Sequence, residues 1–182
     1  MSRPTDARKR QATPTRRRLA RGLVMTACAL MPLAAVAQDA ECLQSDALYA
    51  DLDRTAVISF DAGYAASPGV SNRFDMLIGD IALEGIVIWS TGVERPQAIL
   101  LHDCPQGDAT ATELDACTLW QGIVYAVDAE GEIGFLPGAS ELAAERLLFP
   151  GLPWQLSFTE AFEAGEIADL PFEVFERTGC AS

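Results

Sequence analysis

The chain has 182 residues, with 13 basic and 26 acidic side chains and a formal net charge of −13. Eight of the basic residues and only one acid lie in residues 1–37, so residues 38–182 hold five basic and 25 acidic residues, a net charge of about −20. Nucleic acid and anionic membranes bind proteins through basic patches, and this composition excludes both as partners of residues 38–182.

Residues 1–37 have the layout of a cleavable secretory signal peptide. A basic region precedes an uncharged apolar run, Leu23 to Ala37, that ends in Ala35-Val36-Ala37. This run is shorter than the roughly twenty residues that span a bilayer, and Pro32 interrupts it. We expect cleavage after Ala37, no integral membrane segment after removal of the signal, and a periplasmic or secreted protein. Arg16-Arg17 leaves the twin-arginine route open beside the general one.

The first half of residues 38–182 indicates strands after a short lead-in. A short helix is predicted over Leu43–Leu52, and a loop over Asp61–Asn72. Period-two patterns of apolar residues predict strands, and Gly79-Asp80 divides the longest of them into two. The predicted strands are Thr55–Phe60, Asp75–Ser90 and Gln97–Asp103.

The second half predicts a hairpin, one helix and two more strands. Thr118–Val127 and Glu132–Leu136 form the hairpin around the turn Asp128–Gly131. Ser140 is a favourable N-cap for a helix over Glu141–Leu148. The remaining predicted strands are Trp154–Thr159, with Trp154, Leu156 and Phe158 inward, and Phe172–Arg177.

Strands that follow one another without intervening helices favour an antiparallel arrangement. We predict a single domain over residues 38–182 that is mainly β, an antiparallel β-sandwich or partly closed barrel with one short helix. The alternative is an α+β fold, in which the helix covers an antiparallel sheet.

Four cysteines remain after the signal, an even number in an oxidising compartment. Cys104 ends one strand-like run and Cys117 begins the next, so we predict that they close the polar loop between them. Cys42 and Cys180 lie near the two ends of the domain, and domain ends are often neighbours; they form the second predicted pair. The absence of a C-x-x-C motif, together with a single histidine, argues against zinc.

Three other groups of residues suggest chemistry weakly. The only histidine, His102, has Asp103 as its neighbour, but adjacent strand residues face opposite ways and no nucleophile motif accompanies them. We interpret His102 as structural.

Trp89, Trp120 and Trp154 suggest a sugar-stacking face, although we favour core packing. An oxygen-rich loop suggests calcium, although it lacks the EF-hand order and we favour a solvated loop. The calcium candidates are Asp103, Asp108, Glu113 and Asp115.

These observations favour an exported, non-catalytic binding or accessory module of the periplasm. Its partner, a protein or a small molecule, is not identified by the sequence, and no cofactor is expected. One alternative is a carboxylate-dependent hydrolase, because the many acids offer possible catalytic pairs. Another is a calcium-dependent structural or adhesion domain.

Overall fold

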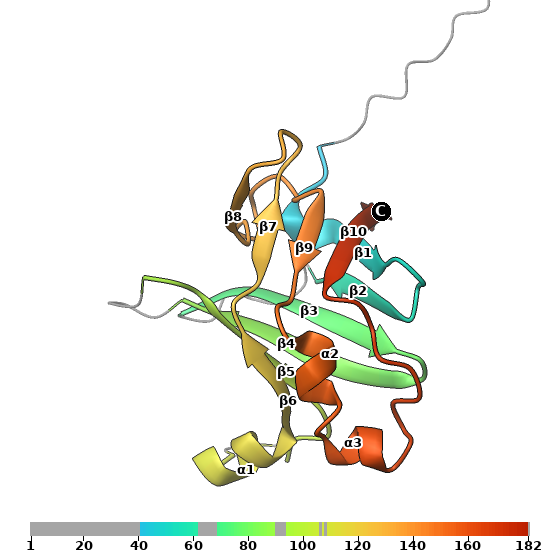
Figure 1. Cartoon of the computed structure of the whole chain (residues 1–182). Coiled ribbons are helices and arrows are strands. Elements are labelled where there is room, and N and C mark those ends of the chain that lie inside the picture. Colours follow the sequence, from blue (N-terminus) through green and yellow to red (C-terminus); the bar gives the residue numbers. More distant parts are fainter. Residues whose placement is uncertain (1–40, 62–68, 90–93, 106, 108, 182) are drawn as a thin grey trace, which may run out of the picture. The chain divides into compact units, whose positions relative to one another are not determined.

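The computed structural model describes residues 41–61, 69–89, 94–105, 107 and 109–181, which belong to one compact unit (Figure 1). Ten strands in this part of the chain form one sheet, with every pairing antiparallel. The strands are β1 (Ala47–Asp51), β2 (Ala56–Phe60), β3 (Val70–Ile78), β4 (Ile81–Ile88), β5 (Gln97–Leu101), β6 (Thr118–Gly122), β7 (Tyr125–Val127), β8 (Ile133–Phe135), β9 (Arg146–Leu148) and β10 (Val174–Cys180).

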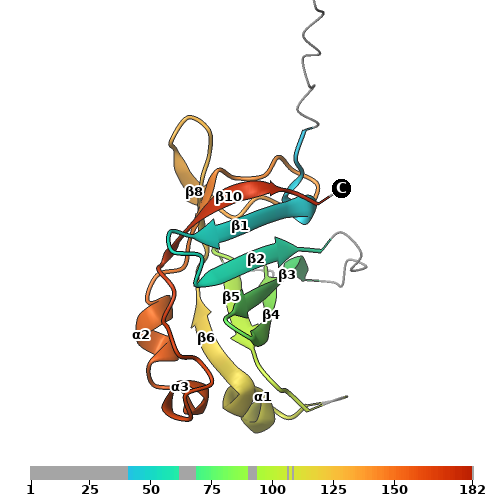
Figure 2. The ribbon, with the colours of Figure 1, turned by 90° about the vertical axis from the view of Figure 1, so that its right-hand side faces the viewer.

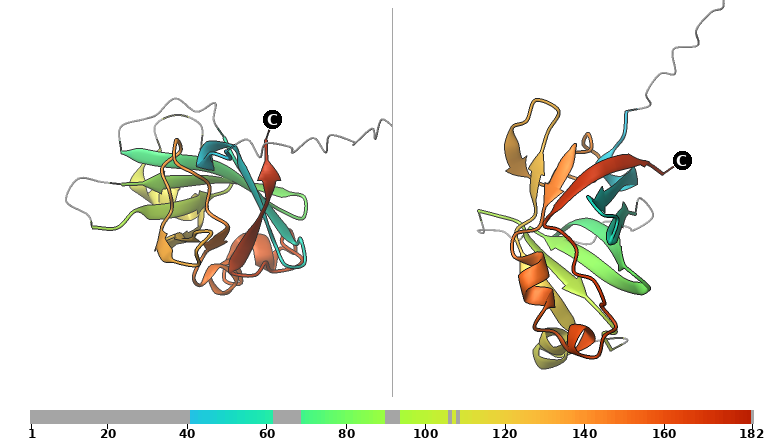
Figure 3. Two further views of the ribbon diagram at one scale, coloured as in Figure 1. Left: turned by 90° about the horizontal axis from the view of Figure 1, so that it is seen from above. Right: turned by 45° about the vertical axis from the view of Figure 1, so that its right-hand side comes forward.

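The strand order is β6-β5-β4-β3-β2-β1-β10-β9-β7-β8. The first six strands follow one another as a meander, and the last strand inserts between β1 and β9, pairing Ala47 with Cys180 and Asp51 with Phe175. Figure 2 shows β10, β1 and β2 side by side, and Figure 3 shows the sheet curling on itself. The predicted class, a mainly β antiparallel sandwich or partly closed barrel, is confirmed, although the described residues contain three short α-helices where one was expected.

Alternation of apolar residues explains the strands and the core. In β2, the side chains of Ala56, Ile58 and Phe60 are buried while those between them are exposed. The rings of Phe74 and Phe149 pack against each other in the core, with their centroids 5.9 Å apart. Further ring contacts continue this cluster: Tyr49–Phe60, Phe60–Phe74, Trp120–Phe149 and Phe149–Phe175.

Short helices gather at the β6 end of the sheet (Figure 1). They are α1 (Ala111–Cys117), α2 (Leu152–Leu156) and α3 (Glu160–Glu163), besides one 3-10 turn, η1 (Gln44–Asp46), before β1. The Gln155 side chain of α2 accepts a hydrogen bond from the Gln121 backbone N–H (3.1 Å) and donates one to the Gln121 carbonyl (3.2 Å). This amide therefore continues the hydrogen-bond ladder beyond β6. None of the helices in the described ranges is long and apolar enough to cross a membrane.

Three predicted elements are wrong. Residues 141–148 do not form a helix: Leu142 bridges Leu43, and Arg146–Leu148 is β9, held between β7 and β10. Pairing with distant strands overrides the local helix pattern. The helix expected over Leu43–Leu52 is η1 followed by β1. The strand expected over Trp154–Thr159 is α2 and the turn after it, where Pro153 lies in the first helical turn.

Several boundaries also differ from those expected. Thr118–Val127 is two strands: β6 lies at one end of the strand order, and β7 lies next to β8 at the other end. Most of the loop predicted over Asp61–Asn72, residues 62–68, lies outside the described residues, and β3 begins at Val70, inside the predicted range. The stretch between Cys104 and Cys117 contains α1, which Thr110 caps at its N-terminus.

Candidate functional site

An open cleft of about 1000 Å³ lies at the β8 end of the sheet. We call it the β8 cleft. Its walls come from the β7–β8 hairpin, from β10, from residues 41–42 and from residues 142–145. The cleft thus gathers segments that lie far apart in the sequence.

Two glycines line the β8 cleft without a local reason for being glycine. Gly134 in β8 and Gly179 in β10 lack the positive φ that favours this residue, and an added Cβ would meet no atom within 4 Å. Gly85 and Gly122 are different, because a Cβ there would lie 2.3 Å from the Phe74 ring and 2.5 Å from the Trp120 ring. The core needs the second pair for packing, whereas the first pair leaves the cleft open.

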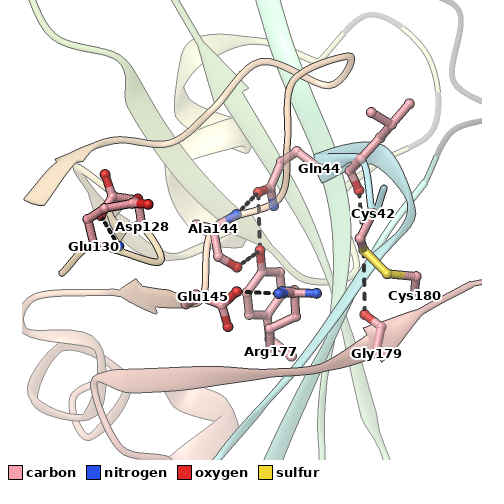
Figure 4. Close-up of polar contacts among 11 residues, drawn as sticks. Cys42, Gln44, Asp128, Glu130, Ala144, Glu145, Arg177, Gly179 and Cys180 are labelled. Atoms are coloured by element: carbon pink, nitrogen blue, oxygen red, sulfur yellow. Dashed lines mark hydrogen bonds and ion pairs between the residues drawn. A yellow bond between two sulfur atoms is a disulfide. The ribbon is translucent and has the colours of Figure 1, made fainter. Parts of the chain in front are cut away.

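Carboxylates surround this opening. Five acids line the cleft and one base, Arg177, faces them. The Arg177 guanidinium pairs with the Glu145 carboxylate, and Figure 4 shows these two side chains pointing toward one another. The side chains of the other acids find no basic partner among the described residues, so the cleft is a region of negative potential. The lining acids are Glu41, Asp128, Glu130, Glu132 and Glu145.

The β7–β8 turn fixes the acids of the hairpin. Asp128 Oδ1 accepts hydrogen bonds from the backbone N–H groups of Glu130 (3.0 Å) and Glu132 (2.8 Å). Gly131 follows with φ +87°, a conformation that glycine adopts without strain. The Asp128 carboxylate is therefore used by the turn itself, while those of Glu130 and Glu132 remain exposed. The predicted turn is present.

A buried polar cluster includes Ala144 of the cleft lining, and Figure 4 shows the Gln44 side chain pointing toward Ala144. Gln44 Oε1 accepts hydrogen bonds from the Tyr49 hydroxyl (3.1 Å) and the Ala144 N–H (3.2 Å), and the Tyr49 hydroxyl also lies 2.9 Å from the Ala144 carbonyl. Burial raises the pKa of Tyr49 to about 12, because the phenolate would lose its hydration. The cluster fixes residues 142–145 against β1.

Two disulfide bonds join the pairs expected from the sequence. Cys42 and Cys180 lie on the cleft wall with Cα atoms 5.9 Å apart, and Cys104 and Cys117 lie 5.2 Å apart at the base of α1. Both separations are ordinary for bridged cysteines. Two disulfides fit an oxidising environment.

A second hollow, of about 750 Å³, lies at the β6 end and contains His102. Its Nδ1 faces the Ala82 carbonyl at 3.3 Å, while Nε2 lies 3.7 Å from Asp103 and 4.0 Å from Glu166. The sequence argument that Asp103 points away from the ring is wrong, because β5 ends at Leu101 and Asp103 has φ +51°. The nearby hydroxyls serve local structure: Thr118 donates to Leu114, and Thr159 caps α3.

The structure describes three of the four calcium candidates, Asp103, Glu113 and Asp115. The Glu113 carboxylate accepts hydrogen bonds from the Thr110 N–H (2.8 Å) and hydroxyl (2.7 Å), which lowers the pKa of that carboxyl. It thereby completes the N-terminal cap of α1. Asp103 and Asp115 are exposed, and Asp108 lies outside the described residues. Among the residues described, no group of three or more potential ligands is placed to hold a metal ion.

The tryptophans do not share one face. Trp120 is buried, as expected. Trp89 and Trp154 are 45% and 67% exposed, so the expectation that they pack in the core is wrong. Trp154 of α2 and Phe158 of the turn after it form an exposed pair with ring centroids 5.0 Å apart.

No protein-family model, curated protein or solved structure matches this chain. The case for its function therefore rests on its own residues. Sequence analysis missed the β8 cleft. The usable signals were Gly134 and Gly179 inside strand patterns, where glycine marks close approach of another group, and the acids concentrated in the turn before Ile133.

Proposed function

We propose that this chain is an exported, non-catalytic binding module that holds its ligand in the β8 cleft. The proposal rests on the absence of side chains at Gly134 and Gly179, which form what we call the open floor of the cleft. Neither backbone conformation nor core packing explains glycine at these two positions. Strand glycines without such a reason favour close approach of a ligand. The exposed apolar side chains of Ile133 (69%) and Leu142 (60%) on the cleft wall add contact area for it.

Export is part of the same proposal. The two disulfides suit an oxidising compartment, and the basic, apolar and small-residue segments of residues 1–37 suit a cleaved signal. N-terminal sequencing of the protein purified from its own host should begin at or near Gln38. An intact Met1 end would contradict export.

Binding is favoured over carboxylate-dependent hydrolysis by the partners of the cleft acids. Glycosidase-type chemistry needs two carboxyl groups that converge on the substrate and remain available for proton transfer or attack. Here Asp128 holds the turn and Glu145 pairs with Arg177. The other three lining acids, Glu41, Glu130 and Glu132, are exposed to solvent rather than enclosed as a converging pair, so the carboxylates suit a binding surface better than acid–base catalysis.

A photocrosslinking experiment tests the site. A benzoylphenylalanine placed at Ile133 or at Leu142, one on each wall of the cleft, should give a discrete adduct after irradiation in the host. Leu52 is the matched control, since it is 78% exposed, apolar and outside the cleft lining. Adducts at both cleft positions but not at position 52 support the proposal. Absence of an adduct at the cleft positions, or the same adducts at all three, overturns it.

A further inference from the structure

We infer that the ligand of the β8 cleft is an extended peptide segment of a partner protein that carries lysine or arginine side chains. This inference rests on the proposed function and names the chemistry of the partner. It draws on three properties of the cleft: the sign of its charge, its apolar side chains, and the flat floor left by its glycines.

Charge selects a cationic ligand. The cleft presents the exposed carboxylates of Glu41, Glu130 and Glu132, for which the described residues provide no ion pair. Its one base, Arg177, already pairs with Glu145. Complementary potentials speed association and exclude partners of the same sign, so a basic segment is favoured and an acidic one is repelled.

Apolar contacts distinguish a peptide from a simple polycation. Ile133 and Leu142 both line the cleft and are more than half exposed, and the Ile133 side chain lies on the other side of the edge strand from Gly134. A polyamine would use only the carboxylates, whereas an extended chain presents side chains alternately to two sides. It can therefore place basic groups at the acids and apolar groups at these two residues.

The glycine floor admits a polypeptide backbone. Gly134 of β8 and Gly179 of β10 both line the cleft without a side chain, and the neighbouring strand β7 adds only the methyl group of Ala126. Without side chains at these positions, a main chain can lie close to the sheet. A substitution with a larger side chain at either position would occupy that space.

The test measures binding of a fluorescent eight-residue peptide with alternating lysine and leucine to disulfide-bonded residues 38–182 by anisotropy. Gly134→Val should weaken binding at least tenfold, and Gly134→Ala should weaken it less. A Cβ at position 134 meets no atom within 4 Å, so the urea midpoint should not fall in Gly134→Ala, and the midpoint of Gly134→Val separates lost binding from lost folding. Unchanged binding by Gly134→Val overturns the inference.

Charge is tested with matched pairs. Glu130→Gln/Glu132→Gln should weaken peptide binding about tenfold, whereas Asp75→Asn/Asp80→Asn should change it less than twofold. Both pairs remove two exposed charges, but Asp75 and Asp80 lie outside the cleft lining. If both double variants lose the same affinity for the peptide, only the overall charge of the protein matters, and the inference is overturned.

Two further probes separate this inference from the proposed function. Spermine should bind more weakly than the peptide, and a peptide with serine in place of lysine should not bind. If spermine binds as tightly as the lysine–leucine peptide, or if the serine peptide binds as tightly as the lysine peptide, the ligand is not a cationic peptide and the inference is overturned. If crosslinks at Ile133 and Leu142 still form in the host, the cleft remains a binding site and only the chemistry of its ligand changes. Loss of those crosslinks removes the proposed function itself.

Discussion

The two edges of the sheet differ in how they are closed. At the β6 edge, the Gln155 side chain supplies one more pair of ladder hydrogen bonds to Gln121, and the helices α1, α2 and α3 gather nearby. At the β8 edge, all three residues of the strand are exposed and β7 is the only neighbouring strand. Open edges invite unwanted pairing, and proteins usually block them. In the described part of the chain, the β8 edge, which borders the β8 cleft, has no such cover.

The two ends also differ in what holds them together. The β6 end is closed locally by Cys104–Cys117, 13 residues apart, and by packed helices. The β8 end depends on Cys42–Cys180, 138 residues apart, and on the cluster of Gln44, Tyr49 and Ala144. A disulfide and buried hydrogen bonds between distant segments can hold this end of the sheet rigid without helices packed over the cleft.

The largest expected effect is loss of the long-range disulfide. In the chain-entropy model, Cys42→Ser/Cys180→Ser lowers the free energy of unfolding by up to about 5 kcal/mol, and Cys104→Ser/Cys117→Ser by up to about 3 kcal/mol. Urea unfolding without reductant measures both. If removal of Cys104–Cys117 lowers the free energy of unfolding more than removal of Cys42–Cys180 does, the long-range disulfide is not the more stabilising of the two.

The next effect is an alkaline loss of stability due to Tyr49. Its pKa rises from 10.0 to about 12 on folding, so the folded state keeps a proton that the unfolded state releases. The stabilisation is complete below pH 10 and is lost as the pH rises toward 12, by roughly 2–3 kcal/mol. Tyr49→Phe should flatten this part of the stability profile, as measured by urea unfolding from pH 8 to 11. Tyr125→Phe is the control, and an equal flattening there would contradict the assignment.

A smaller effect is expected at the closed edge. Gln155→Leu removes both hydrogen bonds to Gln121 and should cost about 1–2 kcal/mol. Sedimentation velocity should also show more self-association, because the β6 edge becomes available for pairing. Gln121→Ala is the control: Gln155 contacts only the backbone of that residue, so stability and association should not change. If both variants behave alike, Gln155 does not close the edge.

The smallest effect is expected at the open edge. Ile133→Lys places a charge on an exposed residue of β8 and should change the free energy of unfolding by less than about 0.5 kcal/mol. Sedimentation velocity at high protein concentration should show less self-association than in the parent, since lysine discourages edge pairing. If Ile133→Lys lowers the free energy of unfolding by more than about 1 kcal/mol, the Ile133 side chain contributes more to stability than its exposure indicates.

Local pattern predicted much of the fold. The alternation in β2, the Gly79-Asp80 break between β3 and β4, and the turn at Asp128–Gly131 were all visible in the sequence. Trp154 and Phe158 misled because residues four apart lie on one side of both a strand and a helix. Gly151 and Pro153 were the signals that distinguish them, since they begin α2.

Long-range pairing was beyond the reach of local pattern. β9 has helix-favouring neighbours such as Glu141 and Ala143, yet it pairs with β7 and β10. The β8 cleft depends on that arrangement, because it brings Glu41, Asp128 and Arg177 together from remote segments. Sequence could supply the acidic character of such a site, but not its location.

The Cys42–Cys180 bond has a mechanical consequence. β1 and β10 are antiparallel neighbours, so the chain enters and leaves the domain at one corner, where Ala47 pairs with Cys180. A pull on the two ends is then borne by a covalent bond, and the 138-residue span between the cysteines carries no tension. After reduction, the same pull would separate β1 from β10 in unzipping geometry, one hydrogen bond at a time. The thiol state of these two cysteines thus decides whether the fold resists force.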